Sequence, residues 1–126
     1  MGNEQLSFSP GEPQKKALSL LGLARKAGKL EMGADPAAEA LQKRKAFLIL
    51  LAGDLSRRSA RKAADAASQK NIPVLQAPWG MDEAADALGK RAGILAVCDR
   101  GFAEKLTALL SRQASSTEEE SYTYDY

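Results

Sequence analysis

Histidine is absent from this sequence and cysteine occurs only once, which removes two common kinds of functional site. Histidine is the commonest general base near neutral pH and the commonest zinc ligand. The single cysteine, Cys98, excludes an internal disulfide framework, and without histidine beside it a structural zinc site is not expected. Because Cys98 lies within an apolar run, we expect it to pack in the core.

Long apolar segments and familiar catalytic motifs are also missing. The longest unbroken apolar run, Ala46–Ala52, is far too short to span a bilayer, and the N-terminus lacks the basic-then-apolar order of a secretion signal. The patterns GxxxxGK[ST], GxGxxG and GxSxG do not occur. An enzyme would have to use Asp, Glu, Lys and Arg alone, and nothing here indicates one. We therefore expect a soluble, cytoplasmic, non-catalytic protein without cofactor or metal.

The 126 residues suit one domain flanked by two polar ends. Residues 1–12 are polar with Gly and Pro and are predicted to be flexible, and residues 13–112 form the predicted domain. Residues 113–126 are acidic and rich in Ser and Thr, which predicts a disordered tail. That tail is either an interaction arm or a plain terminus.

Within the domain, segments with helical spacing alternate with short apolar runs. The predicted helices are Pro13 to Gly28, Asp35 to Arg44, 57–70, Gly80 to Leu88 and Gly101 to Leu110. The predicted strands are Ala46–Ala52, 72–78 and 93–99, the first two buried, with a short extended piece at Leu30–Met32. This alternation predicts a three-layer α/β/α domain.

Two of these helices carry clear inward faces. The first helix is predicted to bury Ala17, Leu20, Leu21, Ala24 and Ala27. The third is predicted to be capped by Ser56 and to bury Ala60, Ala63, Ala64 and Ala67, small residues that allow a close approach to the sheet.

The stretch MGADPAAEALQKRK, residues 32–45, reads as a helix start that could bind an anion. Asp35 is predicted to cap the helix, with Pro36 in its first turn and an ion pair between Glu39 and Lys43. A helix start after a glycine, here Gly33, is suited to a phosphate group. Asp35 and Glu39, the charged residues nearest this helix start, are acidic, so the stretch is either a binding site or only a stable cap.

Positive charge is concentrated in the first half of the chain. Residues 13–62 hold 12 Lys and Arg against 4 Asp and Glu, which favours a polyanionic partner such as nucleic acid, although solvated helix faces would look the same. Lys43, Arg44 and Lys45 suit a helix C-terminus, where they complement the macrodipole. Lys29 precedes the Gly33 helix start, and we expect the two to face one phosphate group. The remaining groups are Lys26, near the end of the first helix, and Arg57, Arg58, Arg61 and Lys62 along the third.

The loop LGKRAG, residues 88–93, is a second candidate for phosphate binding. Lys90 and Arg91 lie between glycines, which allow a close backbone approach to a ligand. The same loop is equally typical of a mobile turn before the last strand.

Taken in order, LLGLARKAGKL, AFLILLAGD, IPVLQAP and LGKRAGILAVCDRGFAEKL resemble the kink-turn RNA-binding family of ribosomal proteins L-seven-Ae and L-thirty-e, and in particular its bacterial YlxQ-like branch. The resemblance covers about Lys15 to Leu110. It implies a single α/β/α sandwich with a mixed central sheet. It also implies a structured RNA partner, of kink-turn or ribosomal type, for a monomeric protein that could associate with the ribosome.

In that family the N-terminus of the second helix enters a groove widened at an RNA kink, and a Gly-x-Asn-Glu-x-x-Lys signature reads G·A pairs there. The loop before the last strand covers an extruded nucleotide. The match here is partial. Gly28, Lys29 and Gly33 fit, and so do Gly89 and Lys90. Asp35, Pro36 and Glu39 stand where the signature has Asn, Glu and Lys, and Arg91 and Ala92 stand where kink-turn readers carry apolar residues.

Two hypotheses follow. The first is an RNA-binding module that uses Lys26, Gly28, Lys29, Gly33, Ala34, Asp35, Lys90 and Arg91. The second is a protein-interaction module that kept the fold and lost kink-turn recognition, since ionised Asp35 only accepts hydrogen bonds and Glu39 repels phosphate. The chain could also be one half of a longer fused protein.

Overall fold

A mixed four-stranded sheet forms the middle layer of the protein. The computed structural model describes residues 12–111, so the predicted acidic tail and nearly all of the predicted N-terminal segment lie outside the described residues. The strands are β1 (Leu30–Met32), β2 (Leu48–Leu51), β3 (Val74–Gln76) and β4 (Ile94–Val97), in the spatial order β1-β4-β2-β3. β2 and β3 are parallel, whereas β4 runs antiparallel to both β1 and β2.

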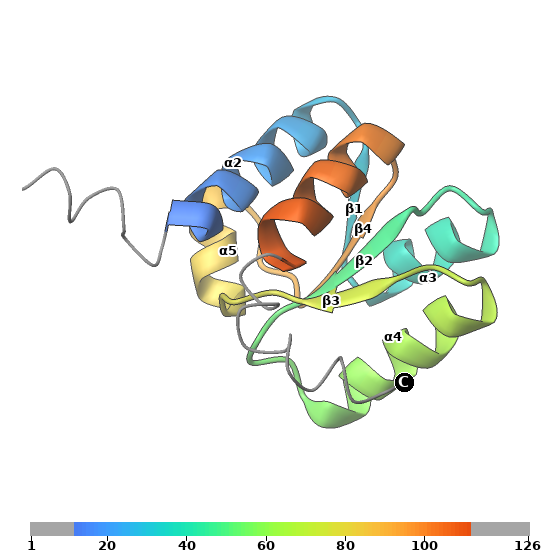
Figure 1. Cartoon of the computed structure of the whole chain (residues 1–126). Coiled ribbons are helices and arrows are strands. Elements are labelled where there is room, and N and C mark those ends of the chain that lie inside the picture. Colours follow the sequence, from blue (N-terminus) through green and yellow to red (C-terminus); the bar gives the residue numbers. More distant parts are fainter. Residues whose placement is uncertain (1–11, 112–126) are drawn as a thin grey trace, which may run out of the picture.

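Helices cover both faces of this sheet (Figure 1). They are α2 (Glu12–Lys26), α3 (Ala34–Gln42), α4 (Arg57–Gln69), α5 (Met81–Leu88) and a final helix over residues 100–111, orange to red in Figure 1. α2, α5 and the final helix enclose one core, into which Leu48, Leu50, Leu95 and Val97 point. α3 and α4 enclose the other, over Ile49, Leu51, Ile94 and Ala96. The predicted α/β/α sandwich with a mixed sheet is therefore confirmed.

The alternation along the two central strands explains why they are apolar throughout. Successive side chains of a strand point to opposite faces, and here both faces carry helices. All four residues of β2 and all four of β4 are buried. The prediction of a strand buried on both faces within Ala46–Ala52 is confirmed.

The predicted second strand lies at the edge of the sheet, so its predicted burial is wrong. Val74 and Leu75 in β3 are only partly buried and Gln76 is exposed, because β3 pairs with β2 alone. The extended piece at Leu30–Met32 is a true strand, β1, which forms the opposite edge.

Two expected core residues lie elsewhere. Ala27 is exposed, because α2 ends at Lys26 and Gly28, with φ +73°, turns the chain away. Ala66, and not Ala64, packs against the core beside Ala60, Ala63 and Ala67. Cys98, just after β4, packs against the core as expected but is only partly buried, and desolvation and nearby Glu31 raise the pKa of its thiol.

Candidate functional site

Three connections meet at one end of the sheet, and they comprise residues 33–35, 52–56 and 89–93. We call this end of the sheet the α3 end. The Gly33 N–H donates to the Ile94 carbonyl over 2.8 Å, and the Ala52 N–H donates to the Gly93 carbonyl over 2.9 Å. These two bonds bring the start of α3 and the connection after β2 to the loop before β4. The predicted site residues Gly33, Ala34, Asp35, Lys90 and Arg91 are thus gathered at the α3 end.

The start of α3 is capped by glycine, so the predicted cap at Asp35 is wrong. The N-cap is Gly33, with φ +112° and ψ 164°, and no side chain accepts a hydrogen bond from the first turn. Asp35 is the second residue of the helix, where its carboxylate interacts favourably with the positive end of the helix dipole. Pro36 lies in the first turn, as predicted, and has no N–H. The free amides of this start are therefore those of Ala34 and Asp35.

Substituting Gly33 by alanine should destabilise the protein by about 1–3 kcal/mol, because its backbone lies in a region that only glycine occupies without strain. Thermal unfolding followed by circular dichroism measures this. Gly22→Ala is the matched control. A Cβ at Gly22, inside α2, would meet no atom within 4 Å, so alanine should stabilise the helix there by about 0.5–1 kcal/mol. An unchanged or raised melting temperature for Gly33→Ala would contradict the expectation.

The loop of residues 89–93 is tied to two neighbouring helices. The Leu88 carbonyl accepts a hydrogen bond from the guanidinium of Arg25 in α2. Arg91 pairs with Asp82 in α5, with Nε and Oδ1 2.8 Å apart, and this contact raises the pKa of Arg91. Lys90 is exposed and has no carboxylate partner among residues 12–111. These contacts favour a held loop over a freely mobile turn, with Lys90 as its unneutralised cation.

Lys26, Gly28 and Lys29 lie at the opposite end of β1 from Gly33. Leu30 pairs with Val97 and Met32 with Leu95, and the Lys29 carbonyl accepts from the Cys98 N–H over 2.8 Å. The three residues of β1 lie between Lys29 and Gly33, and the four residue-to-residue steps of extended chain span about 13 Å. Strand β1 therefore places the backbone of Lys29 and the free amides of α3 at its two opposite ends.

Lys43, which directly follows α3, forms an ion pair with that helix. Lys43 Nζ and Glu39 Oε2 are 2.6 Å apart, which confirms the predicted ion pair. Their mutual hydrogen bond raises the pKa of Lys43 and lowers the pKa of Glu39, so both stay charged at neutral pH. Much of the negative charge that Glu39 places near the signature position is thus offset by its neighbour.

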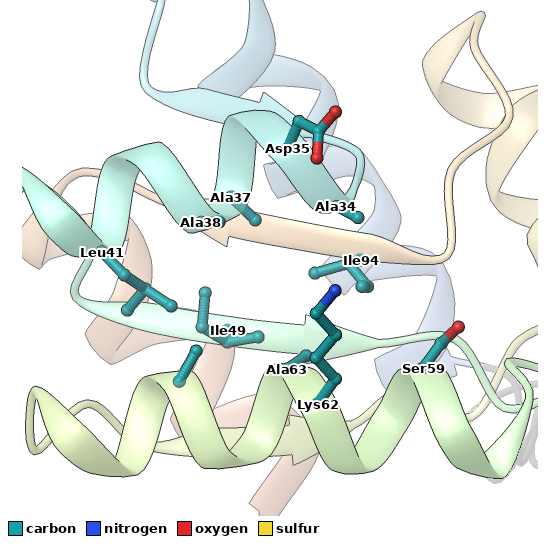
Figure 2. Close-up of a pocket in the computed structure, with 11 residues that line it drawn as sticks. Ala34, Asp35, Ala37, Ala38, Leu41, Ile49, Ser59, Lys62, Ala63 and Ile94 are labelled. Atoms are coloured by element: carbon teal, nitrogen blue, oxygen red, sulfur yellow. The ribbon is translucent and has the colours of Figure 1, made fainter.

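A groove of about 240 Å³ runs between α3 and α4 (Figure 2). Its floor is apolar, formed by Ile49 and Ile94, and its walls carry mostly alanines of the two helices. Figure 2 shows the Lys62 side chain extending from α4 toward Ile94 and Ala34 on the α3 side. The groove is smaller than typical pockets for drug-sized ligands, which measure about 300–1,000 Å³. The sequence alone did not indicate it, since its walls come from segments that only the fold brings together.

In residues 12–111, no helix is long and apolar enough to cross a membrane. The same residues contain no group of three or more Cys, Asp or Glu side chains placed to hold a metal ion.

The chain is similar to proteins of a known family. A family model described as ribosomal protein L7Ae/L30e/S12e/Gadd45 matches residues 15–107. RNA-binding protein YlxQ of Enterococcus faecium is 30% identical over 97 residues, covering 77% of this chain and 93% of that protein. RNA-binding protein YlxQ of Bacillus subtilis is 34% identical over 96 residues, covering 72% of this chain and 91% of that protein.

Solved structures share the fold. A protein of unknown function from Bacillus halodurans superposes with a TM-score of 0.72 at 33% identity, covering 76% of this chain and 97% of that one. The Giardia lamblia 15.5kD RNA binding protein superposes with a TM-score of 0.66 at 15% identity, covering 82% of this chain and 89% of that one.

Proposed function

The chain belongs to the ribosomal protein L7Ae/L30e/S12e/Gadd45 family, and on this premise we propose that it is a non-catalytic protein that binds structured RNA. The observation that carries the proposal is its similarity, over more than nine-tenths of their length, to two bacterial proteins named RNA-binding protein YlxQ. The basic balance of residues 13–62 supports it, because lysine and arginine neutralise the phosphate backbone.

We propose contacts at both ends of β1. At the α3 end, the amides of Ala34 and Asp35 after Gly33, together with Lys90 and Arg91, face the RNA. At the other end, Lys26 and Lys29 meet phosphates, and Gly28 lets the backbone approach closely. Because the two groups lie about 13 Å apart along an edge strand, they contact different phosphates. A folded RNA with an extended backbone can reach both groups, whereas a mononucleotide cannot.

Kink-turn recognition is expected to be weak. Ionised Asp35 can accept a hydrogen bond from a guanine but cannot donate one, and Pro36 offers no polar side-chain group. Glu39 carries negative charge where the family signature has a cation, although Lys43 offsets part of it. We therefore propose binding that depends on RNA shape and backbone charge more than on G·A pairs.

A gel-shift titration tests both parts of the proposal. The probes are a kink-turn RNA and the same RNA with its G·A pairs replaced by Watson–Crick pairs. We expect both to bind, with Kd values within about threefold of each other, corresponding to less than 1 kcal/mol. The affinity should fall steeply with salt, with a slope of log K against log salt near −0.9 for each phosphate contacted.

Two results would change the proposal. A strong preference for the G·A-containing RNA would show that the altered signature still reads kink-turns. Binding to neither RNA at about physiological salt, with co-purification of a protein partner, would instead support a protein-interaction module that kept the fold.

We further propose ribosomal RNA as the cellular partner, with the protein monomeric and located in the cytoplasm where ribosomes are. Sedimentation of the protein with ribosomal particles at low salt, and its release at high salt, would support this partner. A ribosome-free distribution at both salt concentrations would argue against it.

A further inference from the structure

Helix α4 begins with a concentration of positive charge that its own stability does not explain. Arg57, Arg58, Arg61 and Lys62 fall within its first six residues, and its first turn contains no acidic residue. Cations near a helix N-terminus oppose the macrodipole, so this arrangement costs stability instead of adding it. The helix depends on Ser56, whose hydroxyl accepts from the Ser59 N–H, to cap this start.

These four side chains share one exposed side of α4, which we call the cationic stripe: Arg57, Arg58, Arg61 and Lys62. Their spacing places them together one turn apart, whereas Ala60, Ala63 and Ala67 pack on the core. The two ion pairs found among residues 12–111 involve Lys43 and Arg91, so no carboxylate lies within 4.0 Å of the stripe in that part of the chain. Within the described residues, no ion pair neutralises its charge.

The stripe lines a depression on the surface, and Lys62 connects it with the groove beside the α3 end. The four cations and Asp65 line a shallow depression of about 560 Å³. Lys62 also lines the groove between α3 and α4, where its side chain extends toward Ala34 at the start of α3 (Figure 2). Lys62 thus connects the cations on the exposed side of α4 with the groove that leads to the start of α3.

We propose that the cationic stripe is an additional phosphate-binding surface, which holds the sugar–phosphate backbone of the RNA that reaches the start of α3. This inference rests on the proposed RNA-binding function. Three of the four cations are arginines, whose planar guanidinium groups bind phosphate oxygens bidentately. The stripe supplies positive charge beside a helix start where Asp35 and Glu39 contribute negative charge, and so explains how that start can approach RNA.

The chemistry of the stripe favours RNA over other anionic partners. An amphipathic helix that lies on an anionic membrane inserts large apolar side chains beside its cations, whereas the apolar residues of α4 are alanines that face the core. A depression lined by guanidinium groups, open to solvent, fits a run of phosphates. An acidic protein surface is the other partner that the stripe could bind, and the experiment below distinguishes it from RNA.

The triple variant R57Q/R58Q/R61Q tests the inference against the matched control K15Q/K16Q/K105Q. Both remove three exposed cations, and the control positions lie on α2 and the final helix, on the other face of the sheet. The probe is the kink-turn RNA titrated at several salt concentrations. The α4 variant should bind roughly 100-fold more weakly near 0.1 M salt, with a salt slope reduced by about 2–3 units. The control should stay within about threefold of the unmodified protein.

Thermal unfolding separates lost contacts from lost folding. Because the stripe opposes the dipole of α4, the α4 variant should melt at the same temperature as the unmodified protein or a few degrees higher. Weaker RNA binding together with undiminished stability would support the stripe.

Three results would overturn the inference. If the α4 variant and the unmodified protein bind RNA with equal affinity, the stripe does not contact the RNA, while the proposed function remains intact. An equal loss in both triple variants would mean that only total charge matters. If the unmodified protein binds no RNA but binds an acidic protein through the stripe, both the inference and the proposed function fail.

Discussion

Replacing Lys29 and Lys90 together by glutamate is expected to weaken RNA binding by roughly 100-fold or more. Each lysine is exposed, and together they represent the two ends of β1 that we propose to contact different phosphates. A hydrogen bond to a charged group contributes about 1.5–3 kcal/mol, and every 1.4 kcal/mol is tenfold in affinity. Glutamate removes two such contacts and adds repulsion. Titration of the kink-turn RNA, followed by gel shift or fluorescence anisotropy, measures the loss.

The control for this variant is K16E/K105E, which changes the net charge by the same amount. Lys16 and Lys105 are exposed on α2 and the final helix, away from the α3 end. The control should lose less than about tenfold in affinity, because screening limits the effect of distant charges to about a Debye length. If the two double variants bind RNA equally, the proposed contacts at the ends of β1 are incorrect.

Substituting Leu21 by alanine should lower the free energy of unfolding by about 2–5 kcal/mol. Leu21 lies in α2, is fully buried, and packs in the core that α2, α5 and the final helix share with one face of the sheet. Such a loss is a large part of the roughly 5–15 kcal/mol that stabilises a small domain. It should lower the melting temperature by roughly 10–30 °C, measured by calorimetry or circular dichroism.

Leu23→Ala offers a control on the same helix. Leu23 is 55% exposed, and the substitution removes the same atoms and has the same effect on helix propensity. We expect a change of less than about 0.5 kcal/mol, as for ordinary surface positions. Similar destabilisation by both substitutions would mean that α2 does not pack as described.

The central elements could be predicted because their signals are local and redundant. The run Leu48–Leu51 is apolar throughout, as is typical of a strand covered on both faces, and Leu21 and Ala24 repeat at helical spacing. Ser56 was identified as a cap from its position before a helical segment, and the structure shows its hydroxyl in that role. Each of these predictions depends on residues within a few positions of one another.

The candidate site was only partly predictable, because its geometry depends on pairings between distant segments. The sequence indicates both the residues near Gly33 and those near Lys90, but hydrogen bonds to the Ile94 and Gly93 carbonyls bring them to one end of the sheet. Lys29 and Gly33 are near in sequence, yet the pairing of β1 with β4 holds them at opposite ends of a strand.

The sequence by itself determined the helix and strand order, the two-faced burial of β2, the surplus of positive charge and the family resemblance, because each depends on local composition or spacing. The tertiary structure alone decided that β3 is an edge strand, that Gly33 and not Asp35 caps α3, and that Lys62 extends into the groove beside that helix start. Those outcomes depend on which distant segments pack together, and such contacts join residues that are far apart in the sequence.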